Sequence, residues 1–209
     1  MNKIYTIGHS SHKIEYFLYL LKAHSINCLV DVRSMPFSRY TPQFNMNELK
    51  KFLNNNGLYY LFMGKELGAR REDKSLYTKE GYLDFEKVSN TSLFNFGIER
   101  IKSGIEKGFS IALMCTEKDP INCHRNILVA RNFYKQNYQV ENILQNGEIQ
   151  NQRVVEKRLL DTYFPNRMQQ TLFDSRDNSN SLELIEQAYR LRNKDIGYSI
   201  SEEKESLAE

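Results

Sequence analysis

The sequence has little of several residue types whose abundance marks particular classes of protein. It contains no Trp, four Pro and ten Gly among 209 residues, which excludes collagen-like and proline-rich disordered chains. Its three cysteines, Cys28, Cys115 and Cys123, are too few, and odd in number, for a disulfide framework. No apolar run approaches the roughly 20 residues of a membrane span, and no apolar signal region opens the sequence. We therefore expect a cytoplasmic protein with reduced thiols and no membrane partner.

The remaining composition is typical of a globular domain with a mild positive charge. Hydrophobic residues make up 40%, including 12 Phe and 13 Tyr, which is enough for a substantial core. The formal net charge of +3 is compatible with an anionic ligand but lacks the strong basic stripe of a dedicated nucleic-acid binder. We expect one domain over residues 1–164 and a polar tail over residues 165–209, with a possible short helix around 182–191.

Short apolar runs alternate with helical periodicities as far as about residue 145. The runs at 4–7, 28–32, 58–62, 109–114 and 140–144 predict five strands. Helices are expected between them, for example where Ile14, Phe17, Leu18 and Leu21 form an amphipathic stripe, and where Asp119-Pro120 offers a helix start. This alternation predicts an α/β domain with a mostly parallel five-stranded sheet and helices on both faces.

Polar and cationic side chains follow several of the predicted strands. The candidates for binding an anion are Ser10, Arg33, Arg39, Lys65 and Arg125. Ligands of open parallel sheets bind beyond the carboxyl ends of the strands, and Arg forks suit phosphate or carboxylate groups. Because the basic residues follow several strands rather than one, we expect an anion-recognising pocket at this edge.

Two cysteines near the same edge are candidates for nucleophilic catalysis. Cys123 is expected in the first turn of a helix, beside His124 and Arg125, which favour the thiolate form. Cys115 ends a buried strand and can face the same pocket, although inert packing explains both thiols equally well. His9 and His124 are the candidate acid–base groups.

Three carboxylates are further candidates for acid–base or structural roles. Asp31 lies inside an apolar strand next to Arg33, where a structural ion pair is favoured over a general base. Glu66 and Glu117 lie in the loops that follow the third and fourth predicted strands.

Metal binding is an alternative use of the same residues. The side chains of His9, Cys115, Cys123 and His124 are of the types that bind zinc. However, seven residues separate the two cysteines and no CxxC knuckle is present. Zinc is therefore kept as an alternative, and no cofactor is expected.

The tail contains a short motif of another kind. The segment 169–173 has the form Gln-x-x-Leu-Phe and resembles peptides that dock on bacterial DNA sliding clamps through residues such as Gln169, Leu172 and Phe173. The other interpretation is that the Leu-Phe pair packs back on the domain.

Five motifs occur in order and resemble one large prokaryotic family. They are Tyr5-Thr6-Ile7-Gly8-His9-Ser10, Val30-Asp31-Val32-Arg33-Ser34-Met35-Pro36, Pro42-Gln43-Phe44-Asn45, Gly64-Lys65-Glu66-Leu67-Gly68, and the stretch from Leu113 through Cys123-His124-Arg125. The family is known as domain of unknown function 488. The resemblance spans residues 3 to about 145 and implies a shared pocket but no agreed reaction.

A weaker likeness is to rhodanese domains. The segment Leu29–Arg33 resembles the strand that opens them, and the strand ending in Cys115 resembles their catalytic cradle. Such domains hold an anion over the nucleophile with backbone amides and a closely following Arg. Here Arg125 lies ten positions after Cys115 and two after Cys123, so the rhodanese loop itself is absent.

Two functions from different classes fit these observations. The first is an enzyme, a cysteine-dependent transferase or hydrolase acting on a phosphate-bearing ligand such as a nucleotide or nucleic acid. The second is a non-catalytic module that binds a nucleotide or nucleic acid and is tethered to a sliding clamp through residues 169–173.

Overall fold

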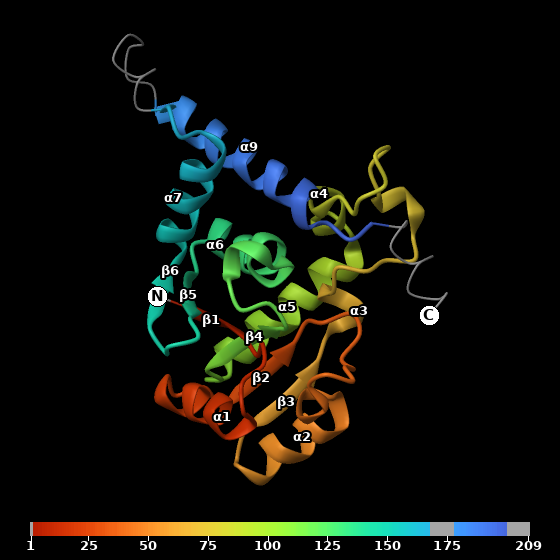
Figure 1. Ribbon diagram of the computed structural model, residues 1–209, viewed down its shortest axis with the longest axis vertical. Helices are drawn as coiled ribbons and strands as arrows, with labels where there is room; N and C mark the ends of the chain where they lie inside the picture. The colour runs from red at the N-terminus through yellow and green to blue at the C-terminus, as the bar shows by residue number, and fades with distance from the viewer. Residues whose placement is uncertain (1, 168–177, 200–209) are drawn as a thin grey trace.

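The computed structural model describes residues 2–167 and 178–199, and these build one α/β unit around a single sheet (Figure 1). The strand order is β3-β2-β4-β1-β5-β6. The strands are β1 (Lys3–Gly8), β2 (Cys28–Asp31), β3 (Tyr59–Phe62), β4 (Ile111–Cys115), β5 (Gln139–Ile143) and β6 (Ile149–Asn151). The first five are parallel to one another, so their carboxyl ends lie at one edge. The predicted α/β class is confirmed.

The prediction of a mostly parallel sheet with five strands is wrong in one respect. The sheet has six strands and is mixed, because β6 pairs antiparallel with β5 and places Ile149 opposite Ile143. A turn at Asn146-Gly147, where Gly147 has a φ of +86°, connects the two strands. A three-residue strand with one apolar side chain has no alternation pattern, so the sequence does not reveal it.

Helices cover both faces of the sheet, as the alternating pattern predicts. Helices α1 (Ile14–Ala23) and α2 (Met46–Asn55) bury Phe17 and Leu49 against one face. The other face is covered by α5 (Ser92–Glu106), α6 (Arg131–Lys135) and α7 (Gln152–Tyr163), together with short helices α3 (Gly64–Leu67) and α4 (Phe85–Ser89). Thr91 is the N-cap of α5, and its side-chain hydroxyl accepts a hydrogen bond from the Phe94 amide.

The last helix, α9 (Asn178–Ile196), lies across α7 and ends beside α4 (Figure 1). Its Ala188 and Tyr189 are fully buried in the core cluster that also contains residues of α5 and α7. The segment 178–199 therefore adds core to the domain. In the described part of the chain, no helix is both long and apolar enough to cross a membrane.

The segment after β4 is folded differently from the single helix predicted there. A 3₁₀-helix, η3 (Pro120–Asn122), begins where the Asp119 carboxylate caps the Ile121 amide. Cys123 then adopts an extended conformation, with φ −135° and ψ 135°. A π-helix, η4 (Arg125–Ala130), follows and continues into α6. Cys123 thus lies at a break between two helices, and π-helical turns are frequent at functional sites.

Candidate functional site

A pocket of about 450 Å³ lies beyond the carboxyl ends of β2 and β4. Its walls come from the loops after β2, α3 and β4, from the break before η4, and from the C-terminal end of α9. The lining residues are Arg33, Ser34, Met35, Ala69, Arg70, Cys115, Thr116, Glu117, Asn122, Cys123, His124, Asp195, Ile196, Gly197 and Tyr198. The edge at which the sequence predicts a pocket therefore carries one.

The wall of this pocket holds a cluster of two thiols and an imidazole. One ligand-type atom from each of Cys115, Cys123 and His124 lies within 4.8 Å of the other two. The His124 Nε2 is 3.0 Å from the carbonyl oxygen of Val32, and a carbonyl only accepts, so this nitrogen carries a proton. The His124 Nδ1 is 3.7 Å from the Cys115 Sγ and faces the thiols.

The two thiols have opposite proton affinities. Burial by itself raises the pKa of Cys123, but a hydrogen bond from Cys115 and the positive charges of Arg125 and His124 hold that pKa well below its usual range. Hydrogen bonding to Cys123 and burial raise the pKa of Cys115 well above its usual range. The surroundings therefore favour loss of the proton from Cys123 before Cys115.

Arg125 is fully buried and holds the loop that follows β4. Its Nη1 donates to the carbonyl oxygen of Glu117, its Nη2 is 3.4 Å from the carbonyl oxygen of Lys118, and its Nε is 3.4 Å from the Thr6 Oγ1. Among the described residues, no carboxylate forms an ion pair with it. The positive charge of Arg125 therefore acts on Cys123 and lowers the pKa of its thiol.

Arg33 is buried, lines the same pocket and is held in a network of hydrogen bonds. Its Nε donates to the Asp31 Oδ1 at 2.9 Å and its Nη2 to the Asp31 Oδ2 at 2.7 Å. The Nη2 also donates to the carbonyl oxygen of Phe44 at 2.8 Å, and the Nη1 to the His9 Nε2 at 3.1 Å. Four of the five N–H groups are thereby used, and one N–H on Nη1 remains for a ligand. The structural ion pair expected for Asp31 is present, and the Tyr60 hydroxyl donates to it at 2.7 Å.

His9 lies behind Arg33 and does not line the pocket. Its ring stacks on Phe44 with 4.3 Å between centroids, and its Nδ1 lies 2.8 Å from the carbonyl oxygen of Ser10. Burial and the charge of Arg33 lower the pKa of His9 to about 4. A neutral ring that donates from Nδ1 and accepts on Nε2 positions the Arg33 guanidinium rather than meeting a ligand directly.

The other candidates from the sequence lie farther from the thiols. Arg39 and Lys65 are exposed and do not line the pocket, whereas Glu117 is exposed on its rim. Glu66 forms an ion pair with Arg100 of α5 at 2.6 Å. Ser10 contributes backbone hydrogen bonds at a φ of 45°. The clamp-like residues Gln169, Leu172 and Phe173 lie outside the described residues.

Several pocket residues were not singled out from the sequence. Arg70 lies over the Tyr198 ring at 4.5 Å, and its backbone amide donates to the Ser34 Oγ at 2.9 Å. Residues 195–198 close the pocket although they are more than 70 positions away from Cys123 in the sequence. The local sequence indicates burial of this segment only through the apolar side chains of Ile196 and Tyr198, which stand in an otherwise polar stretch.

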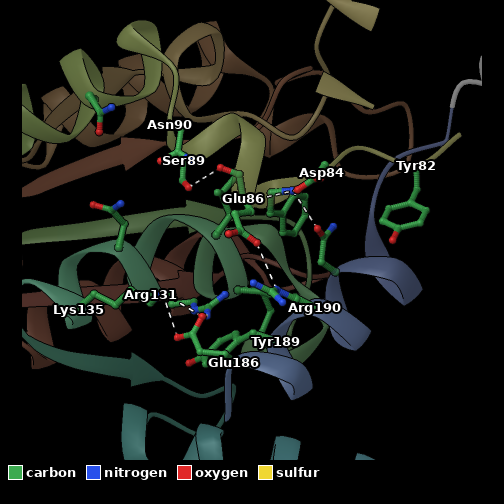
Figure 2. A pocket seen from close by; sticks show the side chains of 16 residues that line it. Tyr82, Asp84, Glu86, Ser89, Asn90, Arg131, Lys135, Glu186, Tyr189 and Arg190 are labelled. Atoms are coloured by element: carbon green, nitrogen blue, oxygen red, sulfur yellow. Dashed lines mark hydrogen bonds and ion pairs between the residues drawn. The ribbon is translucent and has the colours of Figure 1, made fainter. Parts of the chain in front are cut away.

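A second pocket, of about 460 Å³, lies between α4, η4, α6 and α9 (Figure 2). It contains no thiol, and its charged groups neutralise one another. Arg131 and Lys135 pair with Glu186 across the pocket, and Arg190 pairs with Glu86 at 3.2 Å. Because these charges already have partners, the thiol-bearing pocket is the better candidate site.

Three of the four proposed zinc ligands converge, and His9 does not. Cys115, Cys123 and His124 form the group that has the right spacing for a metal ion. Both ring nitrogens of His9 are engaged by Ser10 and Arg33. A metal at the three-residue cluster would keep an open position toward the pocket, as catalytic zinc sites do.

Comparison with known proteins identifies the family. A family model described as domain of unknown function DUF488 matches residues 13–131, more than half of the chain. No curated protein and no solved structure gives a significant match. The likeness to rhodanese domains finds no support in these comparisons. The matched stretch contains Arg33, Cys115, Cys123 and His124, and the chain belongs to the DUF488 family.

Proposed function

We propose that this protein is a cysteine-dependent transferase or hydrolase that acts on a phosphate-bearing ligand, a nucleotide or nucleic acid. The observation that carries the proposal is the convergence of Cys115, Cys123 and His124 in the pocket wall. Although burial opposes it, a hydrogen bond from Cys115 and the charge of the fully buried Arg125 lower the pKa of Cys123 there. A buried cation without a carboxylate partner favours the thiolate, the form of cysteine that acts as a nucleophile.

The reaction follows from the positions of these groups. The Cys123 Sγ attacks the phosphorus atom, so that a sulfur–phosphorus bond forms while the bond to the leaving group breaks. The imidazolium of His124 gives its Nδ1 proton to the leaving oxygen. Water or another acceptor then gives its proton to His124, displaces the phosphoryl group and releases the thiolate.

The anion is held by cationic groups that line the same pocket as the thiols. Arg33 offers its remaining Nη1–H in a fixed orientation, because Asp31 and His9 hold the guanidinium. Arg70 adds a second, more exposed charge to the wall of the pocket. Buried and preorganised donors act strongly on charge that develops in a transition state.

The test is the alkylation rate of each cysteine by iodoacetamide from pH 5.5 to 9, resolved by peptide mass spectrometry. We expect Cys123 to react well below the pH at which Cys28 reacts, because burial raises the pKa of Cys28 to about 11. Inorganic phosphate should protect Cys123 and leave Cys28 unaffected. A Cys123 that titrates no lower than Cys28 in the folded protein would overturn the thiolate mechanism.

A second candidate function, a zinc site, is favoured by the convergence of Cys115, Cys123 and His124. Metal analysis of protein purified from zinc-supplemented medium distinguishes the two. Bound zinc that disappears in the Cys115→Ser variant, but stays in Cys28→Ser, supports the metal site. Protein without zinc and with a reactive Cys123 supports the nucleophile.

The non-catalytic alternative is a nucleotide-binding or nucleic-acid-binding module tethered to a DNA sliding clamp through Gln169, Leu172 and Phe173. Its test is binding of a peptide that covers residues 165–176 to purified sliding clamp. A peptide with Leu172 and Phe173 replaced by Ala is the matched control. If the native peptide does not bind the clamp, the proposed tether is wrong.

A further inference from the structure

We propose that the ligand of this pocket is a single-stranded nucleic acid whose bases stack on an aromatic loop at the pocket mouth. This inference rests on the proposed function, since the same pocket would receive the phosphate. The aromatic loop comprises residues 34–41, between β2 and the 3₁₀-helix at Pro42–Phe44. Three large apolar side chains in it are exposed, Met35 at 61%, Phe37 at 65% and Tyr40 at 97%.

Local hydrogen bonds hold the aromatic loop in its conformation. The Ser38 amide donates to the Asn45 Oδ1 at 2.7 Å, and the amides of Tyr40 and Thr41 donate to the Ser38 Oγ at 3.1 and 3.2 Å. The Met46 amide donates to the carbonyl oxygen of Pro36 at 2.9 Å. Apolar side chains displayed on a preorganised loop lose little conformational entropy on binding, which is typical of a recognition surface.

The aromatic loop begins at the wall of the pocket. Met35 lines the pocket, and the Arg70 Nη1 lies 3.2 Å from the Met35 Sδ. The same Arg70 lies over the Tyr198 ring on the other side of the mouth. If two bases of a strand stack on Phe37 and Tyr40, the phosphates of the adjoining nucleotides would therefore enter the pocket.

Exposed cations in the pocket wall and in the neighbouring segments suit a polyanion. Arg70 lines the pocket, Arg39 lies in the aromatic loop, Lys118 follows Glu117 after β4, and Lys65 lies in α3. None of these four side chains forms an ion pair with any described residue. In the second pocket, by contrast, the cations are paired with Glu186 and Glu86. Two carboxylates that line the pocket, those of Glu117 and Asp195, would repel a polyanion. Of these, Asp195 already accepts from the Tyr163 hydroxyl.

A single strand fits these features better than a duplex. Stacking on protruding aromatic side chains requires unpaired bases, whereas a duplex hides them. The net charge of +3 is also small for a protein that binds the duplex backbone broadly. Aromatic stacking combined with a few phosphate contacts is the usual recognition of single strands.

The test is fluorescence anisotropy of the full chain with labelled oligodeoxythymidylate, oligouridylate and a duplex of the same length. We expect both single strands to bind more tightly than the duplex, and the better of the two identifies the nucleic acid used. Phe37→Ala and Tyr40→Ala should each weaken binding by about 5- to 100-fold, the typical contribution of one stacked base. Arg70→Ala should make the slope of log K against log salt shallower by about 0.7.

Tyr19→Ala is the matched control, because Tyr19 is similarly exposed, at 63%, but lies on α1, outside the aromatic loop and the residues that line the pocket. Its affinity for the single strand should equal that of the wild type. Equal affinities of the two loop variants and the wild type, tighter binding of the duplex, or no single-strand binding at low salt would each overturn the proposal. The alkylation profile of Cys123 tests the thiol mechanism, and the affinities of the Phe37 and Tyr40 variants test the aromatic loop, so failure of the one is distinguished from failure of the other.

Discussion

The guanidinium of Arg33 holds the carboxylate of Asp31 through two parallel hydrogen bonds, of 2.9 and 2.7 Å, where both side chains are buried. This fork, together with His9, fixes the one donor that Arg33 presents to the pocket. The arrangement makes this part of the pocket wall part of the core, so its integrity is measurable as stability.

Asp31→Asn should destabilise the protein by about 3–5 kcal/mol, because it leaves the buried Arg33 charge without its counter-ion. Urea unfolding followed by circular dichroism measures the loss. Glu66→Gln is the control, since it breaks the ion pair with the partly exposed Arg100 and should cost about 1 kcal/mol or less. Equal losses in the two variants would contradict the structural role of the Arg33–Asp31 pair.

His9 should make stability depend on pH between about 6.5 and 4. Its pKa is about 4 in the folded protein and 6.5 in the unfolded chain, so the unfolded chain binds more protons in this window. The stability that the neutral ring contributes is present above pH 6.5 and is lost as the pH falls toward 4, by about 3 kcal/mol in total.

The measurement is the free energy of unfolding in urea at several pH values within that window. His9→Gln should have a flatter slope than the wild type, because the substituted side chain does not titrate. A wild-type slope in His9→Gln would show that other groups cause the dependence.

Arg125→Gln should raise the pKa of Cys123, because the variant removes a buried positive charge beside the thiolate. It should also loosen the loop after β4, whose carbonyl oxygens Arg125 binds. Thiolate absorbance at 240 nm across pH reports the first effect. Arg158→Gln is the matched control, since Arg158 pairs with Asp119 on the same loop but is far more exposed. An unchanged titration in Arg125→Gln would remove Arg125 from the mechanism.

Gly8→Ala should destabilise the protein by about 1–3 kcal/mol and disturb the thiols. A Cβ at position 8 would lie 2.0 Å from the carbonyl oxygen of Glu117, a backbone atom of the loop that Arg125 holds. Gly104→Ala is the control, because it lies within α5 and its Cβ would meet only the flexible end of Ile111 at 3.0 Å. Thermal unfolding compares the two, and similar melting temperatures would contradict the tight packing at Gly8.

Local patterns in the sequence predict much of the frame on which the site is built. Apolar runs predict the five parallel strands, and parallel strands present their following loops at one edge. The convergence of Cys115, Cys123 and His124 fits this reasoning, because β4 and the helix after it place them in one short connection. The third strand is likewise evident from its apolar run, and the first helix from the stripe of Ile14, Phe17, Leu18 and Leu21.

Other features depend on contacts between residues distant in the sequence. The roles of the two arginines differ because Arg33 meets the Phe44 carbonyl and His9, whereas Arg125 meets Thr6 and the loop carbonyls. Nothing near either arginine in the sequence distinguishes one that faces a ligand from one that holds a loop.

The sequence by itself determined the α/β class, the parallel strands and the edge at which the thiols gather, because these follow from hydrophobic periodicity and short connections. Tertiary structure alone decided the antiparallel β6, the closure of the pocket by residues 195–198 and the partner of each buried charge. The physical reason is that burial and pairing depend on which distant groups meet, and a buried charge is stable only beside the partner that folding brings to it.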